Sequence, residues 1–330
     1  MGEIPFVEPL DGVRYGAVEQ VSPLIRRIIA NNPSKYSYRG TGTYIVGHGD
    51  VAVIDPGPAL DEHRDALTAA LEGERVRAIL VTHCHSDHSP LAAWLRESTG
   101  APTIAFGPHG LVALDGDDDD DDEDDEDDED DDTEAEPEAE SDIKMKESID
   151  VAFVPDVCAV DGSIVASSRD WTMCAVFTPG HTSNHMCFAL DQEHALFTGD
   201  HVMGWSTTVV SPPDGDMRAY MNSLRKVIDR SDRILWPTHG NPVTDPQPFL
   251  AAYLAHRLER EAQVLAQVRN DVRTIGAIVK VLYSNVHKEL HKPAGRSVLS
   301  HLVKLVADGA VAVDGGGAPS LKSTFVVPRA

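Results

Sequence analysis

The stretch Thr82-His83-Cys84-His85-Ser86-Asp87-His88 decides which fold we expect for this chain of 330 residues. It directly follows Ala78-Ile79-Leu80-Val81, a short apolar run that is typical of a buried strand. Side chains two residues apart at a strand end point the same way, so His83 and His85 can bind one ion. Asp87 and His88 are displaced by the turn, so they face the position of a second ion. Three histidines and one aspartate in so short a segment indicate a metal site, because packing alone hardly explains them.

Three later segments place a metal-binding side chain shortly after a predicted strand. The strands expected at 173–177, 194–197 and 233–236 are followed by His181, Asp200 and His239. A shared sheet edge can bring all seven side chains together. Zinc prefers imidazole and carboxylate ligands, and catalytic zinc keeps an open position for water. The seven ligands are enough for two divalent metal ions, most simply Zn²⁺, with Asp200 shared between them and a hydroxide bridging them.

The segments around this motif indicate an α/β fold. Two strand-like runs, Thr43–Gly47 and Val51–Ile54, are separated by a short turn and predict a hairpin. Residues 61–73 carry apolar side chains at helical spacing, and the strand at 78–81 comes next. The order strand, helix, strand is typical of an α/β protein. A further strand is expected at Val151–Val154.

One acidic segment carries most of the formal net charge of −26. Residues 115–142 hold 22 of the 54 acidic side chains, which leaves 32 acidic against 28 basic residues elsewhere. The uninterrupted acidic run from Asp117 to Asp132 repels itself and offers nothing to bury. We therefore expect a disordered surface insertion at 115–142. A solvated loop without chemistry is favoured there over a segment that binds cations or a basic partner.

The C-terminal part of the chain predicts a small helical module. Asp245-Pro246 is a suitable N-cap and N1 pair for a helix that runs to about Asn270. Two amphipathic helices at 274–286 and 295–307 then precede two short strands, an order typical of a winged helix. We expect a catalytic domain at 1–244 and a C-terminal domain at 245–330. The mild basic excess after residue 250 suits contacts with phosphates, and it equally suits a dimer or docking surface.

Composition favours a cytoplasmic protein over a membrane or secreted one. No apolar run approaches the roughly 18 to 20 residues that span a bilayer. The start of the chain has neither a basic segment nor an apolar segment of the kind found in signal peptides. The cysteines lie far apart without CxxC spacing, which suits reduced thiols; they are Cys84, Cys158, Cys174 and Cys187.

The HxHxDH motif at 83–88, followed by PGHT at 179–182, TGD at 198–200 and PTHG at 237–240, resembles the metallo-β-lactamase superfamily. The resemblance implies a four-layer αβ/βα sandwich with metals at one edge of two packed sheets. It implies one metal held by His83, His85 and His181, a second held by Asp87, His88 and His239, and Asp200 between them. Asp55 matches an aspartate that orients the metal loop through hydrogen bonds. The β-lactamases of this superfamily lack the bridging aspartate, so Asp200 points toward the glyoxalase II, lactonase and nuclease branches.

Within that superfamily the chain is similar to the β-lactamase-like protein 2 group. The similarity rests on segments spread along most of the chain: 32–33, 40–44, 179–185, 204–209, 220–224, 256–257 and 301–305. It implies a catalytic domain followed by a winged-helix-like domain. The chain departs from the group at the acidic insertion and at Ser183-Asn184, where related sequences often carry an acidic residue.

We therefore expect a binuclear metal-dependent hydrolase in which a bridging hydroxide attacks a carbonyl or phosphorus centre. Asp87 and Asp200 are the predicted catalytic carboxylates, and Asp200 can help to pass a proton to the leaving group. The first hypothesis for the partner is a small-molecule substrate: an ester, thioester or lactone. The alternative is single-stranded RNA, cleaved by an endoribonuclease of the β-lactamase-like protein 2 type, although the acidic insertion repels phosphates unless it points away. A nucleic-acid-binding regulator is disfavoured, because a complete ligand set would then have no purpose.

Other polar residues near the motifs have simpler interpretations. Cys84 sits among the ligands, but packing is favoured over a metal-bound thiolate. His185 and His201 are interpreted as packing residues ahead of hydrogen-bonding partners of the site, and Tyr220 and Asn222 as packing residues on a helix. The sequence leaves the oligomeric state open.

Overall fold

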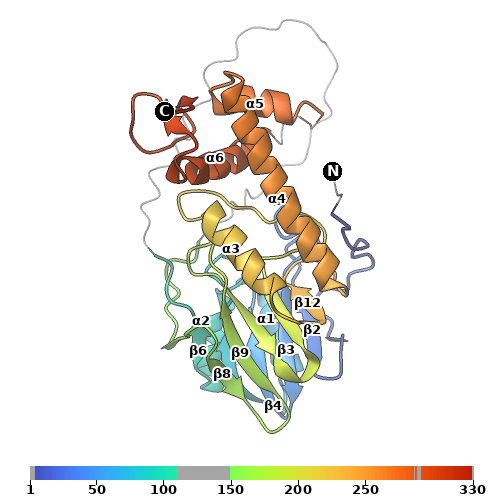
Figure 1. The fold of residues 1–330 in the computed structure, drawn as a ribbon. Helices are drawn as coiled ribbons and strands as arrows, with labels where there is room; N and C mark the ends of the chain where they lie inside the picture. The colour runs from blue at the N-terminus through green and yellow to red at the C-terminus, as the bar shows by residue number, and fades with distance from the viewer. Residues whose placement is uncertain (1–3, 111–148, 286, 288–290, 329–330) are drawn as a thin grey trace, which may run out of the picture.

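The computed structural model describes residues 4–110, 149–285, 287 and 291–328. Two mixed sheets pack face to face around one core (Figure 1). The first has the order β1-β2-β3-β4-β5-β6-β7, and the second has the order β12-β11-β10-β9-β8. The strands of the first sheet are β1 (Glu19–Gln20), β2 (Ile25–Ile29), β3 (Gly42–His48), β4 (Asp50–Ile54), β5 (Arg75–Leu80), β6 (Thr103–Ala105) and β7 (Val157–Cys158). Those of the second sheet are β8 (Ile164–Ser167), β9 (Thr172–Phe177), β10 (Met186–Leu190), β11 (Ala195–Gly199) and β12 (Ile234–Pro237), with a 3-10 turn, η1 (Asp191–Glu193), between β10 and β11.

Helices cover the outer face of each sheet. On the first sheet lie α1 (Asp61–Ala70) and α2 (Leu91–Thr99), whose apolar side chains share one hydrophobic cluster with the strands. On the second sheet lie α3 (Met217–Ile228) and the first part of α4 (Pro246–Arg269). The layers therefore follow the order helix, sheet, sheet, helix. This order confirms the predicted four-layer αβ/βα sandwich.

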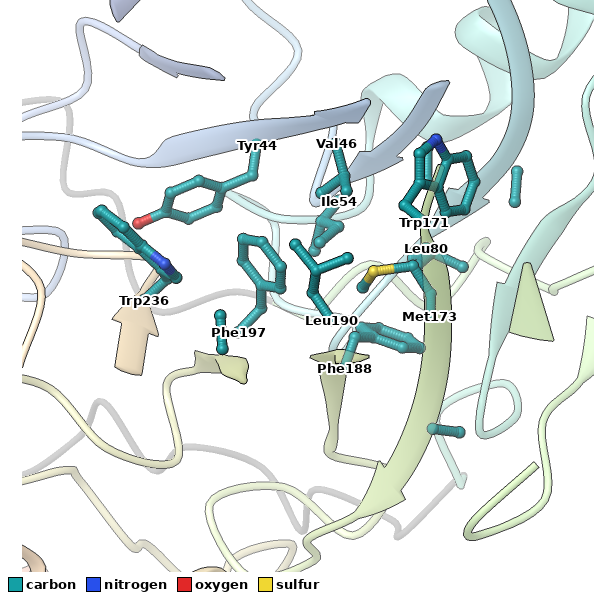
Figure 2. Packing of buried hydrophobic residues seen from close by; sticks show 14 of the residues in the cluster. Tyr44, Val46, Ile54, Leu80, Trp171, Met173, Phe188, Leu190, Phe197 and Trp236 are labelled. Atoms are coloured by element: carbon teal, nitrogen blue, oxygen red, sulfur yellow. The ribbon is translucent and has the colours of Figure 1, made fainter. Parts of the chain in front are cut away.

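The central core lies between the two sheets. In β4, Ala52 and Ile54 point into this core, whereas Val51 and Val53 point toward α1 and α2. The alternation follows from the two-residue period of a strand. One face of β4 therefore packs in the central core and the other packs against α1 and α2. Figure 2 shows the side chains that meet in the centre: Tyr44, Val46, Ile54 and Leu80 from the first sheet, and Met173, Phe188, Leu190, Phe197 and Trp236 from the second.

The long helix α4 joins the sandwich to the C-terminal module (Figure 1). Near its start, Phe249 and Leu250 pack against the second sheet. Near its end, Val264 and Val268 join a separate cluster with α5 (Ile275–Leu282) and α6 (His291–Ala307). The strands β13 (Ala312–Val313) and β14 (Phe325–Val326) then pair as a small antiparallel hairpin. Helices followed by this hairpin agree with the predicted winged-helix module.

The structure corrects several local predictions, and one prediction falls on residues that it does not describe. The segment Val151–Val154 is not a strand: Val151 and Val154 are 67% and 68% exposed, and Phe153 N donates to Asp150 O in a turn. The helix expected at 274–286 ends at Leu282, and α6 begins at His291, before the predicted start at Gly295. The predicted acidic insertion at 115–142 lies outside the described residues. Within the described part of the chain, every helix is too short or too polar to span a lipid bilayer.

Candidate metal centre

Four loops bring the seven candidate ligands together. The loop after β5 carries four of them, and the loops after β9, β11 and β12 carry one each. The ligand atoms form two groups, and within each group they all lie within 4.8 Å of one another. The first group is His83, His85, His181 and Asp200, and the second is Asp87, His88 and His239. The structure thus gathers every side chain that the sequence singled out.

The first group presents imidazole nitrogens without protons to a common point. The single proton of Thr82 Oγ1 goes to Asp55, so His83 Nδ1 must donate to Thr82 and its Nε2 is left bare. His181 Nδ1 donates to Val209 O at 2.7 Å, which leaves its Nε2 bare as well. These two Nε2 atoms lie 2.9 and 3.3 Å from His85 Nδ1. A single ring proton cannot satisfy both lone pairs, whereas a cation between the rings can.

The second group directs the Nε2 atoms of two histidines at carboxylate oxygens. His88 Nδ1 donates to Asp55 and His239 Nδ1 donates to Gly40 O, so the Nε2 atom of each neutral ring carries a lone pair. His88 Nε2 lies 3.4 Å from Asp87 Oδ1, and His239 Nε2 lies 3.3 Å from Asp87 Oδ2. Lone pairs that face one another across such distances repel unless a proton or a metal ion lies between them.

Asp200 lies between the two groups. Its Oδ2 is 3.8 Å from His181 Nε2 and 3.7 Å from His88 Nε2, and its Oδ1 is 3.4 Å from His239 Nε2. Asp200 Oδ1 and His88 Nε2 are both buried, and neither has a hydrogen-bond partner among the described residues. Buried polar atoms normally have partners. Nitrogen and oxygen donors that converge in this way fit divalent cations, so the residues present suit the metals that the sequence predicts.

The charges of the site shift the pKa values of histidines and carboxyls in opposite directions. Burial alone lowers the pKa of His239, but Asp200 and Asp87 more than offset burial and raise the pKa to about 10. Despite burial, nearby carboxylates likewise raise the pKa of His88 well above its usual value. Burial raises the pKa of Asp200, yet His239 and His88 reverse this effect and hold the pKa well below its usual range. Without a metal these histidines hold protons, so protons and metal ions compete for the same nitrogens.

Asp55 connects the loops behind the ligands. Its carboxylate accepts hydrogen bonds from Thr82 N, Thr82 Oγ1, His88 Nδ1 and Thr238 Oγ1, at 2.8 to 3.0 Å. Its backbone has a φ of +47°, in the left-handed region, where a residue other than glycine costs roughly 1 to 3 kcal/mol. The four hydrogen bonds keep the residue in that conformation. This arrangement agrees with the orienting role that the resemblance implied for Asp55.

The alternative candidates have other contacts. Cys84 is buried and accepts a hydrogen bond from Asn184 Nδ2 at 3.0 Å, and burial raises the pKa of its thiol to about 11. His185 is buried behind the ligands, where it bonds Thr178 Oγ1 and accepts from Asp200 N. Tyr220 donates from Oη to His201 O. His185 and Tyr220 therefore support the loop that carries Asp200 and do more than fill space.

A small cavity opens beside the first group. Its volume is about 30 Å³, which suits a water molecule or an ion. His181 and Asp200 form one side of it, and the remaining lining residues are Lys35, Tyr36, Met203, Trp205, Ser206 and Val209. Trp205 stacks on Tyr38, with ring centroids 4.6 Å apart. The approach to the candidate ligands on this side therefore has aromatic walls and one lysine.

The C-terminal module is docked onto the sandwich. α6 contacts both α3 and α4, and it buries Val298 and Leu302 in the module's own cluster. Arg218 of α3 also forms an ion pair with Asp308, just after α6. Most of α6 is thus engaged inside the protein, which weakens the regulator interpretation because a helix that reads a DNA groove must be accessible.

Apart from Asp55, the residues that support the ligands through hydrogen bonds escaped the sequence analysis. Asn32 and Thr41 reach Asp87 through hydrogen bonds, and Thr208 and Val209 reach Asp200 and His181. Asn32, Thr41 and the segment containing Thr208 lie in stretches quoted for the family resemblance, and that overlap was the available signal.

Comparison with known proteins agrees with this geometry. Residues 39–239 match the metallo-beta-lactamase superfamily, and residues 274–318 match the beta-lactamase associated winged helix domain. The chain is 30% identical to an atrochrysone carboxyl ACP thioesterase of Aspergillus chevalieri, over 94% of this chain and 89% of the relative. It is 29% identical to the lactamase-like protein adaB of Aspergillus niger, over 95% of this chain and 89% of that protein.

Solved structures show the same fold. A beta-lactamase domain protein from Burkholderia ambifaria aligns with a TM-score of 0.70 at 19% identity, covering 96% of both chains. A metallo-beta-lactamase family protein from Thermus thermophilus aligns with a TM-score of 0.67 at 22% identity, covering 94% of this chain and all of the other. The chain therefore belongs to the metallo-beta-lactamase superfamily. It is a hydrolase of that superfamily that carries the associated winged-helix domain. The similarity to the β-lactamase-like protein 2 group stays a prediction.

Proposed function

We propose that this hydrolase cleaves thioesters with two zinc ions bound at the candidate metal centre. In this proposal His83, His85 and His181 bind one ion, Asp87, His88 and His239 bind the other, and Asp200 lies between them. The observation that carries the proposal is a set of converging nitrogen and oxygen atoms that hydrogen bonds do not satisfy. The Nε2 atoms of His83 and His181 both face His85 Nδ1, and the buried Asp200 Oδ1 and His88 Nε2 have no hydrogen-bond partner among the described residues. Two divalent cations would supply the missing partners.

The bound metals would polarise the substrate carbonyl and lower the pKa of an attacking water. The chain's own groups then orient that water. The Asp200 carboxylate lies 3.4 to 3.8 Å from histidines of both groups, so it is placed to accept a hydrogen bond from a water held between them. Asp87 provides a second acceptor, with one oxygen already oriented by Thr41 Oγ1 at 2.8 Å.

The ionised carboxyls of the site favour a thioester over substrates with poorer leaving groups. Asp87 and Asp200 are candidate metal ligands, and a bound cation favours the ionised form of a carboxyl, so neither is a ready proton donor. A thiolate leaves without prior protonation, because the pKa of a thiol is only about 8.5. An alkoxide leaving from RNA needs an acid. The relatives named as ACP thioesterases support the same choice.

The acidic segment also disfavours RNA. The chain leaves the described structure at Gly110 and returns at Ile149, which forms a β-bridge with His85. Asp150 also accepts a hydrogen bond from Ser89, next to the ligand His88. In the sequence, the acidic residues 115–142 end seven positions before Ile149. Their charge repels a phosphate backbone but has little effect on a small neutral thioester.

We extend the proposal to the domain organisation and the compartment. We assign residues 1–244 to the catalytic domain and 245–330 to the C-terminal domain, and we place the protein in the cytoplasm. The separate hydrophobic cluster formed by the end of α4 with α5 and α6 supports a distinct C-terminal module. The four free cysteines support a reducing compartment.

The test is hydrolysis by purified, zinc-loaded protein. We expect faster cleavage of an N-acetylcysteamine thioester than of the oxygen ester or lactone with a matched acyl group, and little dependence on salt. Asp200→Asn should reduce kcat by at least about 100-fold, because changing a ligand should cost no less than changing a residue that only supports one, while Asp65→Asn on the exposed face of α1 should not. Cleavage of single-stranded RNA that weakens steeply with salt, without thioester hydrolysis, would overturn the proposed substrate.

A further inference from the structure

Two buried side chains of α4 hold the segment Ser206–Val209 beside the metal centre. Tyr253 Oη accepts a hydrogen bond from Thr208 N at 2.6 Å and donates one to Ser206 O at 2.9 Å. Arg257 Nη2 donates to Thr208 O. Tyr253 is fully buried and Arg257 is 4% exposed. The backbone of this segment therefore depends on α4 for its polar partners.

The same segment holds two candidate ligands. Thr208 Oγ1 lies 2.8 Å from Asp200 O and 3.0 Å from His201 O, and it donates to this pair of carbonyls. The next residue, Val209, accepts a hydrogen bond from His181 Nδ1 at 2.7 Å. That bond leaves Nε2 of His181 as the nitrogen that faces the site. Contacts through Thr208 therefore link α4 to Asp200, and contacts through Thr208 and Val209 link it to His181.

Arg257 does more than make one hydrogen bond. Its Cζ atom lies 5.2 Å from the ring centroid of Tyr220 and 6.0 Å from that of Tyr253, close enough for cation–π attraction. Tyr220 in turn donates from Oη to His201 O at 2.8 Å. The guanidinium therefore joins α3, α4 and the loop after β11. Its buried Nε has no partner among the described residues, a cost that a packing role alone would not explain.

We infer that Tyr253 and Arg257 are positioning residues of the metal centre. They act through Thr208 and Val209 on Asp200 and His181, and neither residue is among the candidate ligands. Metal-site function then depends on the helix that carries the C-terminal module. The inference rests on the ligand assignment of the proposed function and is independent of the thioester.

The test compares variants on the two sides of α4. Tyr253→Phe and Arg257→Met remove the contacts with the Ser206–Val209 segment. Arg260→Met and Tyr283→Phe are the matched controls, because Arg260 lies over the Tyr283 ring, in the C-terminal module. The measurements are the rate of zinc release to a chromogenic chelator, and kcat and KM determined separately. We expect the first pair to weaken zinc retention by about 10- to 100-fold and to lower kcat more than they raise KM. The control pair should match the wild-type protein.

A conservative variant and the metal-free protein separate positioning from stability. Arg257→Lys keeps a cationic donor and should restore most of the zinc retention. Wild-type zinc release and kcat in Tyr253→Phe and Arg257→Met, with only the melting temperature of the metal-free protein lowered, would overturn the inference. If Arg257→Met does not fold, Tyr253→Phe and Thr208→Val decide in the same way. Wild-type protein that takes up no zinc overturns the ligand assignment and this inference together, whereas zinc uptake without thioester hydrolysis overturns the substrate alone.

Discussion

Thr41 donates its hydroxyl proton to Asp87, with 2.8 Å between Oγ1 and Oδ2. The direction of this bond is set by Asn32, whose Nδ2 donates to Thr41 Oγ1 and whose Oδ1 accepts from Thr41 N. One oxygen of Asp87 thus has a neutral donor, while the other faces His88. Thr41 therefore offers a way to perturb one metal group while every candidate ligand stays in place.

We expect Thr41→Val to weaken zinc binding at the second group by about 10-fold, because valine cannot orient the Asp87 carboxylate. Competition with a chelator of known affinity measures the loss. Thr41→Ser keeps the hydroxyl and should bind zinc like the wild-type protein. Equal zinc affinities for Thr41→Val and wild type would show that Asp87 needs no such support.

The ligand groups predict two zinc equivalents per chain. Elemental analysis of the purified protein should approach this value, and Asp87→Ala should lose about one equivalent together with most of the activity. Asp65→Ala, on the exposed face of α1, is the control. A single equivalent in the wild-type protein, with Asp87→Ala fully active, contradicts the two-metal arrangement.

Buried His63 predicts a pH-dependent stability. Burial lowers the pKa of His63 to about 4, below the value of about 6.5 in an unfolded chain. The unfolded chain therefore binds the proton first, so stability is retained above pH 6.5 and falls as the pH drops toward 4. The expected contribution between pH 7 and 4.5 is about 2 to 3 kcal/mol. Urea unfolding of metal-free protein measures it, and His63→Gln should flatten the profile by that amount. Parallel profiles for the variant and the wild type would refute the prediction.

Cys84 should be dispensable for metal binding, although it lies between two candidate ligands in the chain. Its sulfur lies outside both groups of converging ligand atoms and instead accepts a hydrogen bond from Asn184 Nδ2, and burial raises the pKa of its thiol to about 11. Cys84→Ser should retain both zinc equivalents, with at most a lower melting temperature from the altered contact with Asn184. Loss of one equivalent would place Cys84 among the ligands.

The ligand positions were predictable because each ligand follows a strand within a few residues. A strand end leaves the chain little freedom, so the type of side chain and its spacing were enough to place the seven ligands at one sheet edge. The grouping of His181 with His83 and His85 came from the family resemblance. The hairpin β3–β4 and the helix α4 were predictable for a similar reason, since the turn residues of the hairpin and Pro246 at the start of α4 act locally, although the side chain of Asp245 makes no capping hydrogen bond. The strand β10 was missed, although all five of its residues are buried and its apolar run is of the kind that predicted the strand at 78–81.

The supporting contacts were beyond the reach of sequence patterns. Tyr253 and Thr208 are 45 positions apart, and their hydrogen bond involves a backbone atom that carries no sequence information. The strand predicted at Val151–Val154 was wrong, because two valines around a phenylalanine resemble a strand. Only Phe153 is buried there, and a turn places both valines in solvent.

Because α4 is shared by the sandwich and the winged-helix module, it limits how recombination can separate them. Because its first half completes one hydrophobic cluster and its second half completes another, loss of the helix uncovers both. The two parts should then melt in one cooperative transition, unlike domains joined by a flexible linker. A recombination event that exchanges the winged-helix module between relatives must break the chain beyond α4 or replace the helix with a compatible one. Breaks near residue 245 are therefore expected to be rare among functional chimaeras.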